Sequence, residues 1–287
     1  MKPVNLSFHT ATSIDDALVL LSSFGEDSKI IAGGQSLGPM LNYRVARPNV
    51  LVEIRRINAL RDIVDGADSL RIGAAVSHST IEDWSATSPL KRFLSKVAKG
   101  IAYRAIRNRG TIGGSLAHAD PAADWPVVVS ALNADLEIQS RERKRLISAR
   151  EFFVDQMETA LAPDDVLISI RFESKAPRRR YGYYKVARKA GEFADSIAAV
   201  CLELDRDGTV CKTSVWLGAA VTTPCQLSEV EVLLTNSRAG AWHEEKIFEA
   251  IRRSLPAPKG AYESYKVQLH CVSVVRALAD ALEVRPE

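Results

Sequence analysis

"KIIAGGQSLGPML", residues 29–41, begins as a short β-type run that is broken by the adjacent glycines Gly33 and Gly34. Glycine has no Cβ, so it lets the backbone adopt φ > 0 or approach a ligand closely. Successive backbone N–H groups at such a turn can converge on an anion such as a diphosphate. No Lys-Ser or Lys-Thr follows the glycines and the spacing is not G-x-G-x-x-G, which excludes two common phosphate-binding motifs. Alone, the stretch fits a tight turn after a strand equally well.

A second glycine-rich stretch, "RNRGTIGGSLAHADPAADWP", occupies residues 107–126. It offers bare backbone, hydroxyl groups and carboxylates, at Gly110, Gly113, Gly114, Thr111, Ser115, Asp120 and Asp124. Acidic side chains suit ribose hydroxyls in dinucleotide sites. Asp120 is equally suited to cap a helix that begins at Pro121. Two such loops on neighbouring subdomains predict a site for a long dinucleotide between them.

The sequence around the first loop has a β-α-β pattern. Ser13 and Asp16 are spaced as a capping box before the apolar periodicity of residues 14–24. Strands are predicted at 29–32 and 50–54. This order favours a small parallel sheet.

Residues 60–175 alternate strands and helices in a mixed order. Strands are predicted at 70–76, 135–140, 144–148 and 165–172, and helices at 77–84, 88–101 and 121–134. The strand pairing is predicted to be antiparallel. The segment 173–180, rich in charge and proline, is the predicted linker.

Strands precede helices in the last third of the chain. Strands are predicted at 181–187, 196–205 and 209–220, the last two joined by a hairpin turn at Asp207-Gly208. Helices are predicted at about 226–236, 241–254 and 262–283. This order predicts an α+β domain with a three-stranded antiparallel sheet.

The composition is that of an ordinary globular protein. The chain has 287 residues, of which 46% are hydrophobic and 25% charged, and its formal net charge is +3. This charge gives no drive toward nucleic acid or an anionic membrane. No apolar run approaches the roughly 18 residues of a membrane span, and the first residues lack the apolar region of a signal peptide. The predicted location is the cytoplasm.

Cysteine and histidine spacing gives no support for a metal site. Cys201, Cys211, Cys225 and Cys271 form no CxxC pair, and the five histidines form neither HxH nor HExxH. Cys201 and Cys211 flank the predicted hairpin turn, and we interpret them as small core residues rather than a disulfide.

The stretches "AGGQSL" and "TIGGSLAHADPAADWP", followed by "DVLISIRF" and "YYKVARKAGEFA", carry a resemblance that runs the whole chain. In this order and at this separation they resemble the FAD-binding medium subunit of molybdenum hydroxylases. That family includes the flavoprotein subunits of carbon monoxide dehydrogenase and quinoline oxidoreductase and the middle portion of xanthine dehydrogenase.

The resemblance implies the residues that contact FAD. The first loop would wrap the diphosphate with Ile31, Ala32, Gly33, Gly34, Gln35, Ser36 and Leu37. The second would contribute Thr111, Gly113, Gly114 and Ser115, with Asp124 on the ribitol or ribose side and Asp120 either a ligand contact or a helix cap. Leu167 or Ile168 would pack near the flavin or adenine end. It implies no catalytic residue and no metal ligand in this chain.

Lys185 matches the lysine of the family's "YxKxxRR" stretch, so it would place positive charge near the flavin. The alternative for Lys185 is a solvated lysine at a strand end. Glu192 stands where the family commonly has Asp before Phe-Ala. Phe193 is either a core residue or a flavin neighbour, and His118 is interpreted as a loop residue near the cofactor.

The implied fold is α+β, of the PCMH-type FAD-binding class. The FAD-binding domain would span 1–175 with subdomains of about 1–58 and 59–175, and a C-terminal α+β domain would span 176–287. FAD would lie extended between the first two parts, with its ring facing the third.

The implied function is electron relay within a molybdenum hydroxylase. A large partner subunit would hold molybdopterin, and a small one would carry [2Fe–2S] clusters, in a dimer of heterotrimers. This chain would pass electrons through FAD to an external acceptor. The absence of clustered cysteines fits this role and argues against the branch resembling benzoyl-CoA reductase, whose flavin subunit carries an extra cluster.

Two other functions stay open at this point. One is a self-sufficient flavin oxidoreductase of the wider PCMH-type family. The other is a non-enzymatic nucleotide-binding scaffold subunit.

Overall fold

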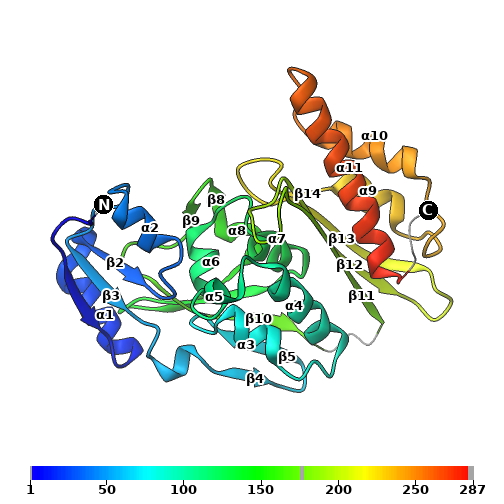
Figure 1. Cartoon of the computed structure of the whole chain (residues 1–287). Coiled ribbons are helices and arrows are strands. Elements are labelled where there is room, and N and C mark those ends of the chain that lie inside the picture. Colours follow the sequence, from blue (N-terminus) through cyan, green and yellow to red (C-terminus); the bar gives the residue numbers. More distant parts are fainter. Residues whose placement is uncertain (1, 175–177, 284–287) are drawn as a thin grey trace.

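The computed structural model describes residues 2–174 and 178–283, and its main sheets follow one another along the chain (Figure 1). The N-terminal sheet lies at one end of the molecule and the C-terminal helices at the other, with the second sheet between them (Figure 1). Within the described residues, no helix has both the length and the apolar character needed to cross a membrane. The same residues contain no group of three or more His, Cys, Asp or Glu side chains placed to hold a metal ion.

The first sheet is three-stranded and parallel, with the strand order β1-β3-β2. Its elements are β1 (Ser7–Thr10), α1 (Ile14–Phe24), a 3-10 turn (Gly25–Asp27), β2 (Ser28–Ile31), α2 (Leu37–Asn42) and β3 (Val50–Glu53). Ser13 caps α1 by accepting from the Asp16 N–H at 3.0 Å. The Asp16 carboxylate accepts from the Thr12 N–H at 2.8 Å, so the second bond of the predicted capping box falls one residue earlier. The predicted parallel sheet is confirmed.

The second sheet is five-stranded and antiparallel throughout, in the order β4-β5-β10-β6-β7, as predicted for this region. Its strands are β4 (Ile63–Asp65), β5 (Ser69–Gly73), β6 (Asp135–Gln139), β7 (Lys144–Ser148) and β10 (Val166–Glu173). The other elements here are a 3-10 turn (Asn58–Leu60), α3 (His78–Asp83), α4 (Pro89–Gly100), α5 (Arg104–Arg107), α6 (Ile112–His118), α7 (Asp124–Ala131), α8 (Ala149–Phe152), β8 (Phe153–Asp155) and β9 (Glu158–Thr159).

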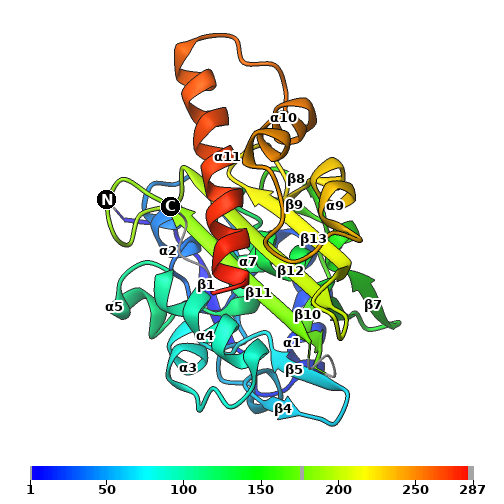
Figure 2. The same cartoon turned by 90° about the vertical axis from the view of Figure 1, so that its right-hand side faces the viewer.

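The C-terminal sheet has four strands, one more than predicted, because a short strand pairs with its third one. Its elements are β11 (Arg179–Val186), β12 (Ser196–Leu204), β13 (Val210–Gly218), β14 (Cys225–Gln226), α9 (Ser228–Leu234), α10 (Glu244–Ser254) and α11 (Ala261–Ala281). Figure 2 shows α11 lying across the strands of this sheet. Gly182 permits that approach, since a Cβ there would overlap the Ala277 carbonyl of α11.

The strand β12 is buried on both faces, and its alternating side chains join two cores. Ala198, Val200 and Leu202 pack against the C-terminal helices. Ile197 and Ala199 point the other way, into the core that contains Trp125 of α7. This period of two follows from the pleat of a strand. The C-terminal sheet is therefore packed onto the second sheet's helices.

Two local predictions are wrong. The helix expected from Pro121 begins at Asp124, because the Asp120 carboxylate accepts from the Ala122 N–H at 2.9 Å and forms a turn before the helix. Asp120 therefore does not cap the helix. Cys211 is exposed rather than in the core. Cys201, by contrast, is partly buried and packs against the core. All four cysteines are free.

The predicted linker lies between β10 and β11, which end and begin at Glu173 and Arg179. Its central residues, 175–177, lie outside the described part of the chain.

Candidate functional site

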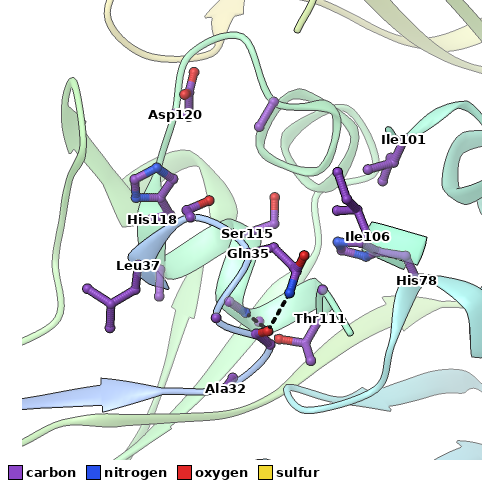
Figure 3. A pocket seen from close by; sticks show the side chains of 18 of the residues that line it. Ala32, Gln35, Leu37, His78, Ile101, Ile106, Thr111, Ser115, His118 and Asp120 are labelled. Carbon is purple, nitrogen blue, oxygen red and sulfur yellow. Dashed lines mark hydrogen bonds between the residues drawn. The ribbon is translucent and has the colours of Figure 1, made fainter. Parts of the chain in front are cut away.

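A cavity of about 420 Å³ lies between the first glycine loop and the second. Its volume falls within the range of small-molecule sites, about 300–1,000 Å³. Figure 3 shows Leu37 and His118 on one side of the cavity and Ile101 and Ile106 on the other. Its further wall comes from Lys185 of β11 and from the segment after that strand.

The cavity collects nearly every residue that the sequence predicts for the site. The predicted residues that line it are Ile31, Ala32, Gly33, Gly34, Gln35, Ser36, Leu37, Thr111, Gly113, Gly114, Ser115, Asp120, Asp124, Leu167 and Lys185. Ile168 does not line it, because it points from β10 into the core of the N-terminal sheet beside Val52 and Val166. Of the two alternatives, Leu167 thus faces the cavity.

The first loop turns sharply and touches the second through bare backbone. Gly34 has φ +69°, a left-handed conformation that favours glycine. The Gln35 side-chain amide donates to the Gly33 carbonyl at 3.0 Å (Figure 3). A Cβ on Gly33 would overlap the carbonyl oxygen of Arg109 and lie 2.7 Å from the Cα of Gly110. Only glycine therefore lets the two loops meet.

The first loop leaves its backbone donors open. Within residues 2–174 and 178–283, no protein group accepts from the N–H groups of Gly33, Gly34, Gln35, Ser36 and Leu37. Backbone N–H groups are nearly always paired in folded proteins, and an unpaired run beside a cavity is typical of an anion cradle. This row of donors is the strongest ligand-binding feature of the cavity.

The glycines of the second loop use their backbone donors within the protein. The N–H of Gly113 donates to the Ala74 carbonyl at 2.9 Å, and that of Gly114 donates to Oγ1 of Thr111, the cap of α6, at 3.1 Å. Gly110 and Gly113 line the cavity as predicted, although both are largely buried. Ser115 differs: its hydroxyl points into the cavity (Figure 3) and has no partner within the described ranges.

Asp124 joins α7 to β11 at the edge of the cavity. Its carboxylate is 5% exposed and accepts from the Tyr183 hydroxyl and from Nζ of Lys185 at 3.1 Å. Burial raises the pKa of Asp124, and the Lys185 ammonium opposes that rise. The Lys185 side chain is only 11% exposed, so the alternative of a solvated lysine is wrong.

Three further residues that the sequence left open lie at the cavity. His118 is the last residue of α6 rather than a loop residue, and burial lowers its pKa. Phe193 is 62% exposed at the rim, so it is not a core residue. In the neighbouring residue Glu192, Oε2 lies 3.9 Å from Nε of Arg188.

Sequence reasoning missed the apolar side of the cavity and one histidine. Ile101, Ile106 and Met157 line the cavity, but nothing in their neighbourhood in the sequence marks them. His78 lines it too, and its Nδ1 accepts from the Trp125 indole N–H at 3.1 Å. Burial and the nearby Arg107 lower its pKa to about 4. The contacts join residues far apart in sequence, so no local signal could have found them.

The arrangement suits a long ligand with an anionic part and a ring. The open amides of the first loop can hold an anion, while the isoleucines opposite offer apolar surface to a planar group. The Asp124 carboxylate is paired with Lys185, and the Ser115 hydroxyl is neutral, so these groups add little net charge to the cavity. The geometry thus matches a nucleotide better than a small charged metabolite.

Comparison with known proteins gives consistent results. Residues 4–172 match the family described as the FAD binding domain in molybdopterin dehydrogenase. The alpha subunit of the 6-hydroxypseudooxynicotine dehydrogenase complex of Paenarthrobacter nicotinovorans is 34% identical, over 98% of this chain and 96% of that subunit. The carbon monoxide dehydrogenase medium chain of Afipia carboxidovorans is 33% identical, over 98% of each chain.

The fold of this chain is also similar to that of solved structures. A chain of carbon monoxide dehydrogenase from Hydrogenophaga pseudoflava superposes with a TM-score of 0.91 at 30% identity, covering 99% of both chains. A chain of quinoline 2-oxidoreductase from Pseudomonas putida 86 gives a TM-score of 0.89 at 28% identity, also covering 99% of both chains. The similarity therefore includes the C-terminal sheet and helices beyond the matched family region.

Proposed function

This chain belongs to the family of FAD-binding domains of molybdopterin dehydrogenases, as the medium, FAD-binding subunit of an oxidoreductase complex, and from this premise we propose that it relays electrons through FAD. The donor would be the [2Fe–2S] clusters of a small subunit, and the recipient an external acceptor. A large subunit with molybdopterin would carry out the hydroxylation. The assembly would be a dimer of heterotrimers in the cytoplasm.

The residues present fit FAD. The open N–H groups from Gly33 to Leu37 offer the donors that a diphosphate needs. Opposite them, Gly114 has no Cβ, and an added one would lie 2.8 Å from Oγ1 of Thr111 and 3.9 Å from the Cβ of Ala32. The row of open donors is the single observation that supports the binding mode most strongly.

When bound, FAD supplies a carrier that accepts electrons singly from iron–sulfur clusters and passes them on in pairs. The chain's own part is binding and orientation. The first loop would hold the diphosphate, and the Ser115 hydroxyl would donate a hydrogen bond to the cofactor. Lys185, held by Asp124, would keep a positive charge beside the ring and favour its reduced, anionic form.

The proposal includes the division of the chain. Subdomains of about 1–58 and 59–175 would form the FAD-binding domain, and 176–287 would form the C-terminal domain. The first sheet ends at Glu53 and the second begins at Ile63, which supports a boundary near residue 58. The cavity lies between these two parts and is closed by β11 of the third.

The test is an absorbance spectrum of the chain purified with its accompanying polypeptides, before and after dithionite. We expect flavin bands that bleach, iron–sulfur absorption and two further subunits. Flavin in a lone chain that turns over substrate would instead indicate a self-sufficient oxidoreductase. A chain that stays colourless after incubation with FAD would contradict the proposal and favour a scaffold role.

A further inference from the structure

His78 is a buried polar side chain that the proposed relay does not use. It is the first residue of α3 and is 5% exposed. Its backbone N–H donates to the Gly110 carbonyl at 2.9 Å, which fixes the residue against the second loop. Its ring lines the cavity, on the side of Ile106 (Figure 3).

The hydrogen-bond partner of Nδ1 determines which ring nitrogen carries the proton. The Trp125 indole N–H can only donate, so Nδ1 must accept at the observed 3.1 Å. Burial and Arg107 lower the pKa of His78 to about 4, so the ring is neutral near pH 7. The proton of a neutral ring that accepts at Nδ1 resides on Nε2.

The Nε2–H has no acceptor in the protein as far as the described ranges extend. No buried side-chain nitrogen or oxygen there lacks a partner, so an unpaired Nε2 must retain access to solvent space. The cavity that the ring lines provides that access. A Cβ on Gly110 would lie 2.9 Å from Nε2, so glycine keeps this edge of the ring uncovered. An N–H donor that is buried without an acceptor destabilises a protein.

The surroundings select the kind of acceptor. Ile101 and Ile106 lie on the same side of the cavity as His78, whereas the open amides belong to the first loop. A neutral donor beside apolar side chains suits a neutral acceptor on a planar ring better than a phosphate.

We propose that His78 is a cofactor-binding residue, whose Nε2–H donates a hydrogen bond to a carbonyl oxygen or ring nitrogen of bound FAD. The inference rests on the proposed function. The acceptor belongs to the isoalloxazine or to the adenine, which share this chemistry. The visible spectrum separates them, because only a bond to the isoalloxazine shifts the flavin bands.

Two substitutions in the full chain test the two ring nitrogens separately. In His78→Asn, Oδ1 takes the place of Nδ1 and still accepts from Trp125, but the shorter side chain has no donor at the position of Nε2. In His78→Gln, Nε2 of the amide keeps that donor, while the acceptor for Trp125 is lost. Thermal unfolding without FAD reports the Trp125 bond, and titration with FAD reports the cavity bond.

We expect His78→Asn to bind FAD about 3- to 10-fold more weakly at nearly unchanged stability. His78→Gln should bind FAD nearly as the parent does but unfold at a lower temperature. Equal FAD affinity in His78→Asn and the parent would overturn the inference. So would equal losses of affinity in both variants. A parent chain that binds no FAD would instead reject the proposed function itself.

A measurement on the unsubstituted chain covers the case in which a variant does not fold. With 15N-labelled histidine, the Nε2–H resonance of His78 should move downfield when FAD binds. A resonance that stays in place while FAD binds would also overturn the inference.

Discussion

The two glycine loops that meet at the cavity use their glycines for different purposes. In the first loop, the N–H groups from Gly33 to Leu37 have no protein acceptor among the described residues. In the second, the N–H groups of Gly113 and Gly114 are bonded to the Ala74 carbonyl and the Thr111 hydroxyl. Similar sequences therefore give one loop with open backbone donors and one loop whose glycine N–H groups are already bonded within the protein.

The difference shows that a glycine-rich loop beside a ligand site need not bind through its backbone. Glycines of the second loop serve packing, since a Cβ on Gly113 would overlap Ala74. The bonds of its glycine N–H groups hold the second loop before any ligand arrives, and the first loop supplies open donors. A preformed support facing a set of open donors lowers the ordering cost of binding.

The largest effect should come from the point where the loops touch. In Gly33→Ala, the added Cβ would overlap the Arg109 carbonyl, and neither backbone can move without parting the loops. We expect a loss of at least about 3 kcal/mol in the free energy of unfolding, together with loss of FAD retention. Urea unfolding and the flavin content of the purified chain measure these.

Gly38→Ala is the matched control in the same segment. An added Cβ there meets nothing within 4 Å, and Gly38 lies in the first turns of α2. Stability should stay equal or rise by up to about 1 kcal/mol, because alanine favours a helix over glycine. Equal losses of unfolding free energy in Gly33→Ala and Gly38→Ala would refute the close contact between the loops.

A smaller loss should follow from breaking the pair behind the second loop. Lys185→Met leaves the buried Asp124 carboxylate with Tyr183 alone. Because Asp124 can take up a proton, we expect the loss in the free energy of unfolding to stay below about 3 kcal/mol, the lower end of the cost of breaking a buried ion pair. We also expect the flavin midpoint potential to fall, because a cation that favours the reduced ring is gone. The measurements are urea unfolding and a redox titration.

The double variant Asp124→Asn with Lys185→Met distinguishes the cost of an unpaired carboxylate from the other effects of losing Lys185. It removes both charges, so most of the lost stability should return. A single Lys185→Met variant with the parent's stability and potential would exclude Lys185 from the site.

The smallest effect concerns an open side-chain donor of the second loop, the Ser115 hydroxyl. Ser115→Ala removes a hydroxyl that points into the cavity and bonds no described residue, so stability should change by less than about 0.5 kcal/mol. FAD should bind about 3- to 10-fold more weakly. Fluorescence titration with FAD measures the change, and an unchanged affinity would exclude Ser115 from cofactor binding.

Much of the fold could be predicted because local signals agreed with it. The capping residue Ser13, the Asp207-Gly208 turn and the alternation along β12 each act within a few residues, so the sequence shows them directly. The two glycine loops were found for the same reason. The helix predicted from Pro121 begins only at Asp124, because an Asx turn at Asp120 precedes it.

The rest depended on contacts between distant residues. Leu167 and Ile168 are adjacent and both buried, and only the packing on each face of β10 shows which one meets the cavity. The burial of Lys185 follows from its pairing with Asp124, far away along the chain. The bonding of the second loop's amides to Ala74 likewise requires the folded sheet.

Hydrogen–deuterium exchange of single amides, with and without FAD, tests the central contrast most directly. The amides of Gly34 to Leu37 should exchange fast in the free chain and become protected when FAD binds. Those of Gly113 and Gly114 should be protected in both states, because protein groups already accept from them. If FAD instead protected the amides of the second loop and left those of the first loop unchanged, the contrast between open and bonded N–H groups would be contradicted.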